Sequence, residues 1–557
     1  MNKFKKILIN LLDWFVLFYF VFLLGFFITD FAFILNEGIS NLSVHSIIFV
    51  FLLGMRRYLD KESFSSSLLI KLLKRLSGLR DAKIIWFLSL TLTFIFLYIG
   101  IMRHFAFSSA GIDMGVTDQA LWNTVKGRVL FSSIDGHINH LGAHFEPVLF
   151  LIAPLYFIWP NIIILIFLQA LAVGLAVFPL YLISKERLKS RFLVFAFIFA
   201  YFLSRPLRGA GLLDFHTDVF LIPLSFTSYY LLITRRNLWA VVAMLLMLCC
   251  KENASILIFA YGIFTIACLK RYSLGVLLLA LATSWWLAAT DLIMPHFANT
   301  TAYPYLKWLP FGPTYAGNLL AVAKDPMLLV KLLFSPEKME FYIKLFLPLG
   351  LLSFLSPAHY VLFLLPLASQ VVGSANHGGM MTLTSHYPAH TLPFIFISAI
   401  YGAGKLVDGR GERVSIWLAA VIIFLSLLFF GKSDGYKLSK FIRSALQLHS
   451  SEIRRALKNI PESASVSAVH RIAPHLTHRK YIYIWENSPD KRYLVEYVIL
   501  HRRLIEADQE RFAQVIAELR ERGFKEAYTD KYNDFFIFFN PLYKNGSLSS
   551  IHGKINL

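Results

Sequence analysis

Long apolar stretches separated by short polar connections constrain this chain more than any other feature of its sequence. A helix needs about 20 apolar residues to cross the hydrocarbon core of a bilayer. Only 16% of the residues are charged and 57% are hydrophobic, whereas soluble domains carry about 25% charged residues. The pattern therefore predicts an all-α polytopic membrane protein with about 13 transmembrane helices. The expected spans are 7–29, 41–56, 84–102, 161–183, 190–204, 217–234, 237–250, 254–269, 272–294, 341–355, 357–373, 390–406 and 414–431.

Lysine and arginine cluster in every second connection, which predicts the orientation of the helices. Basic connections face the cytoplasm, and they occur here before the first span and at 56–83, 185–191, 235–236, 270–271 and 405–413. The N-terminus is thus expected in the cytoplasm and the C-terminus outside it. The net charge of +20 belongs to these anchors, and without a recognition module we expect no nucleic-acid partner. The first run extends past the apolar core of a signal peptide and is expected to be retained.

One apolar segment, Phe145–Trp159, is expected to lie in the membrane interface instead of spanning it. It contains Pro147 and Pro154 and ends in interfacial aromatic residues. Counting it as a span would place the basic connection at 185–191 outside the cytoplasm, against the alternation of the other connections.

The composition divides the chain into three parts. Residues 1–83 are expected to form two additional N-terminal helices with their basic connection, and 84–436 the transmembrane core. Residues 437–557 become charged and are expected to fold as a small extracytoplasmic α/β domain. Its predicted elements are strands at Ser465–His470, Tyr481–Trp485, Tyr497–Leu500 and Phe535–Phe539, and a helix at about Gln509–Arg522.

The ionisable residues of the predicted non-cytoplasmic connections are the candidates for chemistry. In the first such loop, Asp113 lies between glycines, where a carboxylate could approach a substrate and act as a general base. Helix capping is the alternative for Asp113 and Asp118. The spacing of His137, His140 and His144, followed by Glu146, suits a metal ion, although such loops are often merely polar.

The next such loop combines cations with a carboxylate–imidazole pair. Asp214 and His216 suit a divalent cation or a substrate hydroxyl. Arg205 and Arg208 stand where the positive-inside tendency disfavours them, which favours phosphate binding; anchoring to lipid phosphates is the alternative.

Two further connections contribute charged and aromatic residues. Lys251 and Glu252 lie between apolar runs, where a charge is costly unless it is paired or functional. Adjacent residues on a helix diverge by about 100°, so we expect Lys251 and Glu252 to have different partners; a snorkelling hairpin is the alternative. His386 and Tyr387 lie in a loop rich in Gly, Pro, His and Tyr that suits a sugar or lipid headgroup.

Several motifs, in order, resemble an uncharacterised membrane family, domain of unknown function 2079, from about residue 100 to 500. They are GIDMGVTDQALW, HFEPVLFLIAPLY, LLDFHTD, KENASILIFAYG, SHYPAHTLPF and IPESASVSAVHRIAPHLTHRKYIY. That family is similar to the GT-C glycosyltransferases, which use polyprenyl-phosphate-linked sugars. The resemblance implies that Asp113 matches the essential aspartate of the first loop, and Asp214–His216 a second, sometimes metal-binding motif. Where the family commonly has Lys-Glu-Asp, this chain has Lys251-Glu252-Asn253, so a third-position carboxylate is absent.

The leading interpretation is a GT-C-type glycosyltransferase in a prokaryotic cell membrane. It would move a sugar from a lipid-linked phosphate donor to an acceptor glycan, lipid or protein on the extracytoplasmic side. The alternatives are a transporter or flippase for a lipid-linked intermediate, and a scaffold whose C-terminal domain binds a partner. The expected catalytic residues are Asp113, Asp118, Lys251 and Glu252; the expected substrate-binding residues are Arg205, Arg208, His144, Glu146, His386 and Tyr387. No cofactor is required by the sequence, but a divalent metal ion is a candidate at Asp214 and His216, with Asp113.

Overall fold

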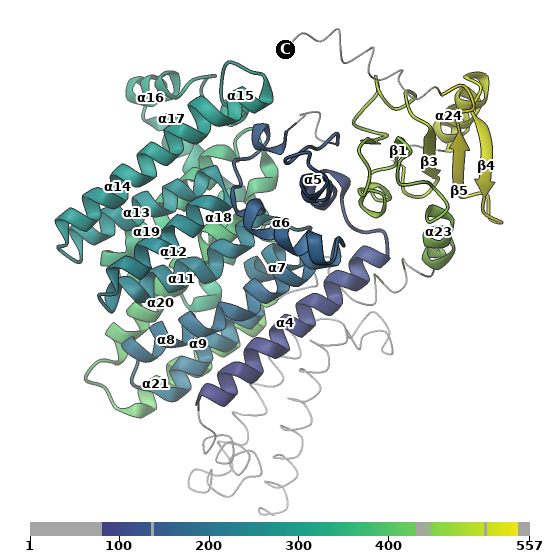
Figure 1. The fold of residues 1–557 in the computed structure, drawn as a ribbon. Coiled ribbons are helices and arrows are strands. Elements are labelled where there is room, and N and C mark those ends of the chain that lie inside the picture. Colours follow the sequence, from purple (N-terminus) through teal and green to yellow (C-terminus); the bar gives the residue numbers. More distant parts are fainter. Residues whose placement is uncertain are drawn as a thin grey trace, which may run out of the picture.

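The computed structural model consists of a large helical bundle and a smaller C-terminal domain that contains the sheet (Figure 1). It describes residues 81–134, 139–430, 448–505 and 509–543, together with Phe441, Ser444 and Leu446. The two predicted N-terminal spans at 7–29 and 41–56, and His137, lie outside the described residues.

The long helices of the bundle run between two ends that carry different kinds of charged residue. At one end, the connections rich in Lys and Arg contact each other through ion pairs between Arg187 and Asp408 and between Arg191 and Asp81. We call this the basic end. The helices are α4 (Asp81–Phe105), α7 (Ile163–Leu175), α8 (Val177–Arg187), α9 (Arg191–Leu203), α10 (Arg205–Leu212), α11 (Leu221–Ile233), α12 (Asn237–Cys250), α13 (Ser255–Ala267), α14 (Tyr272–Leu287), α15 (Met294–Ala298), α16 (Tyr315–Lys324), α17 (Met327–Leu333), α18 (Pro336–Phe346), α19 (Tyr360–Gly373), α20 (Leu392–Val407) and α21 (Glu412–Phe430).

All but one of the predicted apolar runs in the described part of the chain form helices, but many of these helices are shorter than a membrane span. Four helical segments are long and apolar enough to cross a membrane: Asp81–Phe105, Ile163–Arg187, Tyr272–Ala298 and Glu412–Phe430. A fifth is reached if α9 and α10 are counted as one span bent by 50°. Others, such as α12 with 14 residues, reach only about 21 Å of a core about 30 Å thick. The count of 13 is therefore not confirmed.

The predicted span at 341–355 is wrong. Helix α18 ends at Phe346, and the chain continues through two 3₁₀ turns at Leu347–Leu349 and Leu352–Leu355. Pro348 has no backbone N–H to continue the helix. Gly350 then adopts φ of +64°, in the left-handed region where a side chain is disfavoured. An apolar run is thus divided by two residues that stop helices.

The segment predicted to lie in the interface forms a short helix, α6 (Val148–Ile158). Its 11 residues would cover about 16 Å, too little to cross the bilayer. Phe157 and Ile158 are 71% and 82% exposed at its end. Apolar side chains exposed in this way are what a helix lying in the membrane interface would present.

The C-terminal domain contains the five-stranded sheet, in the order β2-β1-β3-β5-β4. Strand β1 is parallel to β2 and β3, whereas β5 is antiparallel to β3 and β4. The four predicted strands and the predicted helix are confirmed; the exposed edge strand β4 was not foreseen. The elements are β1 (Val466–Ala468), β2 (Ile482–Ile484), β3 (Tyr497–His501), β4 (Lys525–Thr529), β5 (Phe535–Phe539), α23 (Ser450–Leu457) and α24 (Gln509–Glu521).

The loop after α4 and the helix α5 (Val116–Val125) are packed into this domain. Phe107, Val116 and Ile134 belong to its apolar core. Gln119 links the two parts: its amide Nε2 donates to the carbonyl oxygens of Arg479 and Lys480, each at 3.1 Å. Its carbonyl oxygen accepts from the Ser132 hydroxyl and the Ser133 N–H, each at 2.9 Å. The C-terminal domain thus fixes the first loop of the bundle.

We predict that Gln119→Ala loosens this connection. Unsatisfied buried polar groups cost about 1–3 kcal/mol each, so the variant should unfold at a lower temperature and release the C-terminal domain faster in limited proteolysis. Gln514→Ala, at an exposed position of α24, is the matched control. Equal proteolysis rates for the two variants would show that Gln119 does not hold the domains together.

Candidate functional site

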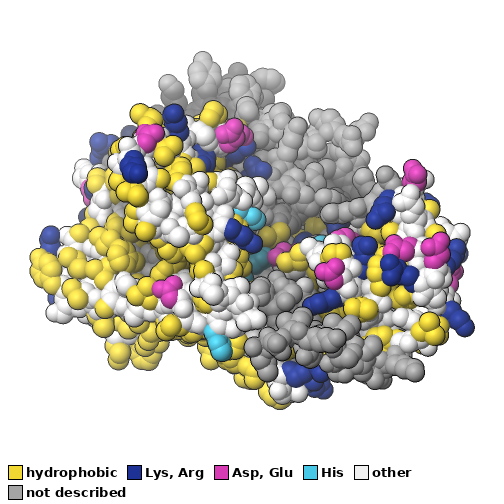
Figure 2. Space-filling model, turned by 90° about the horizontal axis from the view of Figure 1, so that it is seen from above, with side chains coloured by type: hydrophobic (Ala, Val, Ile, Leu, Met, Phe, Trp, Pro, Cys, Tyr) yellow, Lys and Arg dark blue, Asp and Glu magenta, His cyan; other side chains and the backbone are white. Residues whose placement is uncertain are grey.

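Histidine and acidic side chains gather at the end of the bundle opposite the basic end. Viewed from above, a few histidine and acidic side chains are visible between the bundle and the C-terminal domain (Figure 2). The carboxylates predicted from the sequence, Asp113, Asp118, Glu146, Asp214 and Glu252, all have partners at this end. We call it the site end.

Asp214 organises the centre of this cluster. Arg103, in the last turn of α4, donates to both of its carboxylate oxygens at 2.7 and 3.0 Å. The Ala110 N–H donates to the same carboxylate at 3.1 Å, immediately before the GIDMG turn that carries Asp113. The backbone carbonyl of Asp214 lies 2.8 Å from Nδ1 of His216, so that nitrogen carries the proton. One residue therefore positions both Asp113 and His216.

Asp113 and His216 form a carboxylate–imidazole pair. Nε2 of His216 lies 3.6 Å from Oδ1 of Asp113. The Asp113 turn is held against the C-terminal domain, because the Gly111 N–H donates to the His470 carbonyl at 3.0 Å. A Cβ at Gly111 would lie 2.8 Å from the end of the Ile484 side chain and 3.0 Å from the His470 carbonyl oxygen, so a larger residue would force these neighbours to shift.

Asp113 and His216 each shift the pKa of the other. Burial opposes ionisation of Asp113, but the adjacent His216, with further charge from His470 and Arg103, lowers its pKa below the usual value. Burial likewise disfavours the charged imidazole of His216, yet Asp113 raises its pKa overall. At neutral pH the pair is thus biased towards aspartate and imidazolium.

Asp113 differs from the other carboxylates of the site end in its exposure. Its side chain is 37% exposed, whereas the Asp214 and Glu146 side chains are 2% and 7% exposed. Those of Glu252 and Asp118 are 2% and 0% exposed. Among the described carboxylates of this cluster, Asp113 is the one that a substrate could reach.

Asp118 lies inside the contact with the C-terminal domain. Its carboxylate accepts from the Tyr156 hydroxyl at 2.7 Å and from the Thr477 hydroxyl, and His478 Nε2 lies at 3.1 Å. Burial opposes its ionisation, but His478 lowers the pKa of Asp118 overall. These partners favour a structural role for Asp118 over the predicted catalytic one.

Lys251 and Glu252 have different partners, as predicted. Lys251 Nζ donates to Asp218 at 2.9 Å, and Asp218 also contacts His390 Nε2 at 2.5 Å. Glu252 accepts from the Phe145 N–H at 3.1 Å and lies 3.2 Å from His144 Nδ1.

The other residues of the first loop join the same network. His144 Nε2 lies 3.1 Å from the Tyr305 hydroxyl. Glu146 lies 3.3 Å from His140 Nε2 and accepts from the Thr217 hydroxyl at 2.9 Å. Burial opposes ionisation of Glu146, but the interaction with His140 lowers its pKa to about 2.

Of the four remaining substrate-binding candidates, two lie beside the pair and two do not. The His386 ring stacks on His216 with centroids 3.7 Å apart, and the Tyr387 hydroxyl lies 3.0 Å from His377 Nε2. Arg208 donates to the Phe430 carbonyl at 2.6 Å and lies over its ring. Arg205 lies at the other end of α10, beside a separate groove.

The predicted metal-ligand set of Asp113, Asp214 and His216 does not fit this geometry. Both Asp214 oxygens accept hydrogen bonds from Arg103, and Nδ1 of His216 faces a carbonyl. A guanidinium occupies the position where a cation would bind the carboxylate. In the part of the chain that the structure describes, no group of three His, Cys, Asp or Glu side chains is arranged to hold a metal ion.

Three partners of these residues were not singled out from the sequence. Arg103, Asp218 and His478 are 111, 33 and 360 positions from the side chains they pair with. One signal pointed to Asp218: it and Lys251 are opposite charges at the ends of neighbouring apolar runs on one side of the bundle.

We predict that Asp214→Asn destabilises the protein far more than Asp113→Asn. Removing one member of a buried ion pair leaves an uncompensated charge, at a cost of about 3–5 kcal/mol, and the Arg103 and Asp214 side chains are only 10% and 2% exposed. The half-exposed Asp113 is the matched control. Thermal unfolding in detergent measures the difference, and equal midpoints would contradict the positioning role of Asp214.

Comparison with known proteins places these residues within a family. No curated protein matches the chain. The crystal structure of ArnT from Cupriavidus metallidurans bound to undecaprenyl phosphate is similar to this chain at 12% sequence identity, over 83% of this chain and 98% of that one, with a TM-score of 0.48. The model of a family described as predicted membrane protein (DUF2079) matches residues 103–534. The match covers more than half of the chain, and the protein belongs to this family of predicted membrane proteins.

Proposed function

We propose that the protein is a membrane glycosyltransferase that transfers a sugar from a polyprenyl-phosphate-linked donor to a hydroxyl acceptor at the site end. Asp113 is the general base that takes the proton of the acceptor hydroxyl. The nucleophilic oxygen then displaces the lipid phosphate from the anomeric carbon in line, which inverts the configuration.

The observation that carries this proposal is the exposure of Asp113 among buried, paired carboxylates. A general base must come within hydrogen-bond reach of the proton that it removes. Asp113 is 37% exposed, and it is ionised at neutral pH because His216 stabilises its charge more than burial disfavours it. The donor class follows from the resemblance of the sequence motifs to GT-C enzymes.

Charged side chains next to Asp113 could stabilise the negative charge of the departing lipid phosphate. Lys251 and Asp218 both act electrostatically on His216, and Lys251 also acts on Tyr387. The imidazolium of His216 would stabilise the phosphate, because a fixed charge at a developing anion lowers the barrier without reorganisation. Lys251 is paired with Asp218 and only 5% exposed, so we assign it to positioning this network. Arg208 is bound to Phe430 and Arg205 lies at the far end of α10, so we assign neither of them to this step.

Asp113→Asn should reduce sugar transfer by about 10²-fold or more, the usual contribution of a general base. The assay uses purified protein in lipid nanodiscs with a radiolabelled polyprenyl-phosphate sugar. Asp490→Asn, at an exposed position of the C-terminal domain, is the control and should retain full activity. Undiminished transfer by Asp113→Asn would remove this residue from the mechanism.

The rate of transfer should depend on the ionisation of both members of the pair. With Asp113 acting as the anion, activity falls only at a pH below the usual pKa of an aspartate, because the pKa of Asp113 is lowered. With His216 acting as the cation, activity falls as pH rises above the raised pKa of His216. His216→Gln should abolish the alkaline fall. It should also move the acid fall to higher pH, since burial then raises the pKa of Asp113 unopposed by the imidazolium.

The exposed His296→Gln is the control for this pH profile. Arg103, Lys251, Asp218, His386 and His470 also act on the pair and remain in both variants. If the activity of His216→Gln still falls at high pH as it does in the wild type, His216 is not the group whose deprotonation causes that fall.

A further inference from the structure

Two short helices near the site end, α16 and α17, present apolar side chains to the outside of the bundle. They follow the long helix α14 in the chain and lie on the same side of the bundle (Figure 1). Exposed positions recur every three to five residues along each helix, so each helix carries one apolar face. Six large apolar side chains of this segment are between 42% and 73% exposed, and we call them the apolar stripe: Tyr315, Leu319, Leu320, Met327, Val330 and Phe334.

The amide side chain in the middle of α16 is satisfied within the protein. Asn318 Nδ2 donates to the carbonyl oxygens of Gly312 and Thr314 at 2.8 and 2.7 Å, and its Oδ1 accepts from the Phe311 N–H at 2.8 Å. A helix on a surface that faces water shows the reverse arrangement, with its polar residues outward. An exposed apolar surface of this kind marks a place that a partner covers.

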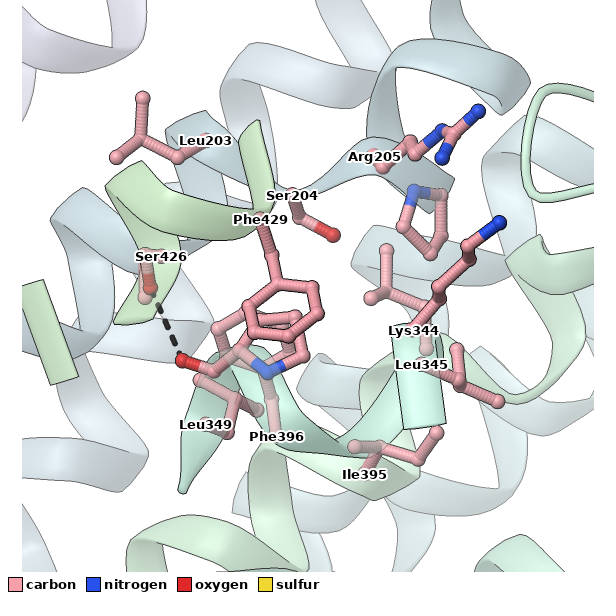
Figure 3. Close-up of a pocket in the computed structure, with 14 residues that line it drawn as sticks. Leu203, Ser204, Arg205, Lys344, Leu345, Leu349, Ile395, Phe396, Ser426 and Phe429 are labelled. Carbon is pink, nitrogen blue, oxygen red and sulfur yellow. Dashed lines mark hydrogen bonds between the residues drawn. The ribbon is translucent and has the colours of Figure 1, made fainter. Parts of the chain in front are cut away.

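The apolar groove beside Arg205 differs from the stripe because its lining is closed to the outside (Figure 3). Phe396 and Leu349, which belong to that lining, are each only 2% exposed. These side chains are part of the packing of the bundle, whereas the apolar stripe offers accessible surface.

The contact between α16 and α14 gives the depth of α16 in the membrane. Helix α14 belongs to a 27-residue apolar segment, Tyr272–Ala298, that is long enough to cross a bilayer, and it begins beside the basic connection at 270–271. Trp286 lies about 21 Å along this helix from Tyr272, and its ring centroid is 6.4 Å from that of Tyr315. Because the hydrocarbon core is about 30 Å thick, α16 begins about 9 Å inside its far boundary.

The surface of α14 at this depth is also apolar and exposed. Leu287 and Leu292 belong to the same segment as Trp286, and both are exposed. The lipid-facing surface of α14 and the apolar stripe therefore lie at about the same level of the bilayer.

The charged residues of the two helices suit a membrane surface. Asp325 Oδ1 accepts from the Met327 N–H at 3.0 Å and thereby caps the start of α17. Lys324 and Lys331 are exposed. A lysine beside an apolar surface can extend its ammonium group to the phosphates of the lipid headgroups.

We propose that α16 and α17 lie in the bilayer leaflet at the site end, with the apolar stripe among the acyl chains. Lys324 and Lys331 reach the headgroup phosphates of that leaflet. The depth of Tyr315 beside Trp286 favours lipid over a soluble partner, because a soluble protein does not enter the hydrocarbon region.

This placement has a consequence for the site. The segment between α15 and α16 brings the Tyr303 hydroxyl to 3.4 Å from Glu252 and the Tyr305 hydroxyl to 3.1 Å from His144 Nε2. It is then held between the site on one side and the membrane-embedded helices on the other.

The test is photolabelling of the full-length protein in nanodiscs that contain phosphatidylcholine with a diazirine in the middle of one acyl chain. Peptide mass spectrometry should find carbene adducts on residues 315–334 as strongly as on the segment with Leu287 and Leu292. The peptide with Leu542, an exposed apolar side chain of the C-terminal domain, is the control and should remain unlabelled. Labelling of 315–334 no stronger than that of the Leu542 peptide would overturn the proposal.

Two matched variants test the environment of the stripe by their effect on stability. A charged side chain is costly in the hydrocarbon region, so Leu319→Asp should lower the midpoint of thermal unfolding in nanodiscs. Leu542→Asp should leave the midpoint unchanged, and equal midpoints for the two variants would contradict the placement of α16. The photolabelling uses the unaltered protein, so it decides the matter even where Leu319→Asp fails to fold.

Native mass spectrometry distinguishes lipid from a second copy of the chain as the partner. Absence of adducts on 315–334, together with a dimer that Leu319→Asp dissociates, would show that another copy covers the stripe and would overturn the proposal. None of these readouts requires sugar transfer. Failure of this proposal and failure of the proposed activity are therefore distinguishable.

Discussion

The bidentate ion pair between Arg103 and Asp214 is the interaction on which the site end depends. It joins the last turn of α4 to the connection after α10, and both side chains are nearly buried. Because Asp214 also accepts from Ala110 and places its carbonyl against His216, a single carboxylate sets the backbone on both sides of the Asp113–His216 pair. The exposed carboxylate of Asp113 is thus positioned by the buried carboxylate of Asp214.

The C-terminal domain provides the second constraint. The Asp113 turn is anchored from the bundle by Asp214 and from the domain by the His470 carbonyl. Asp118 and Gln119, a few residues later, bind the 477–480 segment of the same domain. A loop between two rigid bodies would otherwise be mobile, and preorganised geometry is what electrostatic catalysis requires. In this arrangement the domain is part of the site's support and not an appendage.

Much of this organisation could be predicted from local sequence. Apolar runs predicted helices, short strand-like runs predicted four of the five strands, and the flanking glycines drew attention to Asp113. The roles of individual carboxylates could not be predicted in the same way, because they depend on partners distant in sequence. Asp214 matched a metal-binding pattern, yet its partner is Arg103, 111 residues earlier. Asp118 was expected in catalysis, yet it binds Thr477, 359 residues later.

The central claim is that Asp113 alone, among the described carboxylates of this cluster, is open to a reactant. Carbodiimide labelling of the folded protein with a water-soluble amine, followed by peptide mass spectrometry, measures this directly. We expect modification of Asp113 and protection of Asp118, Glu146, Asp214, Asp218 and Glu252 until the protein is unfolded. Protection of Asp113, or labelling of Asp214 or Asp118 to the same extent in the folded protein, would contradict this account of the site.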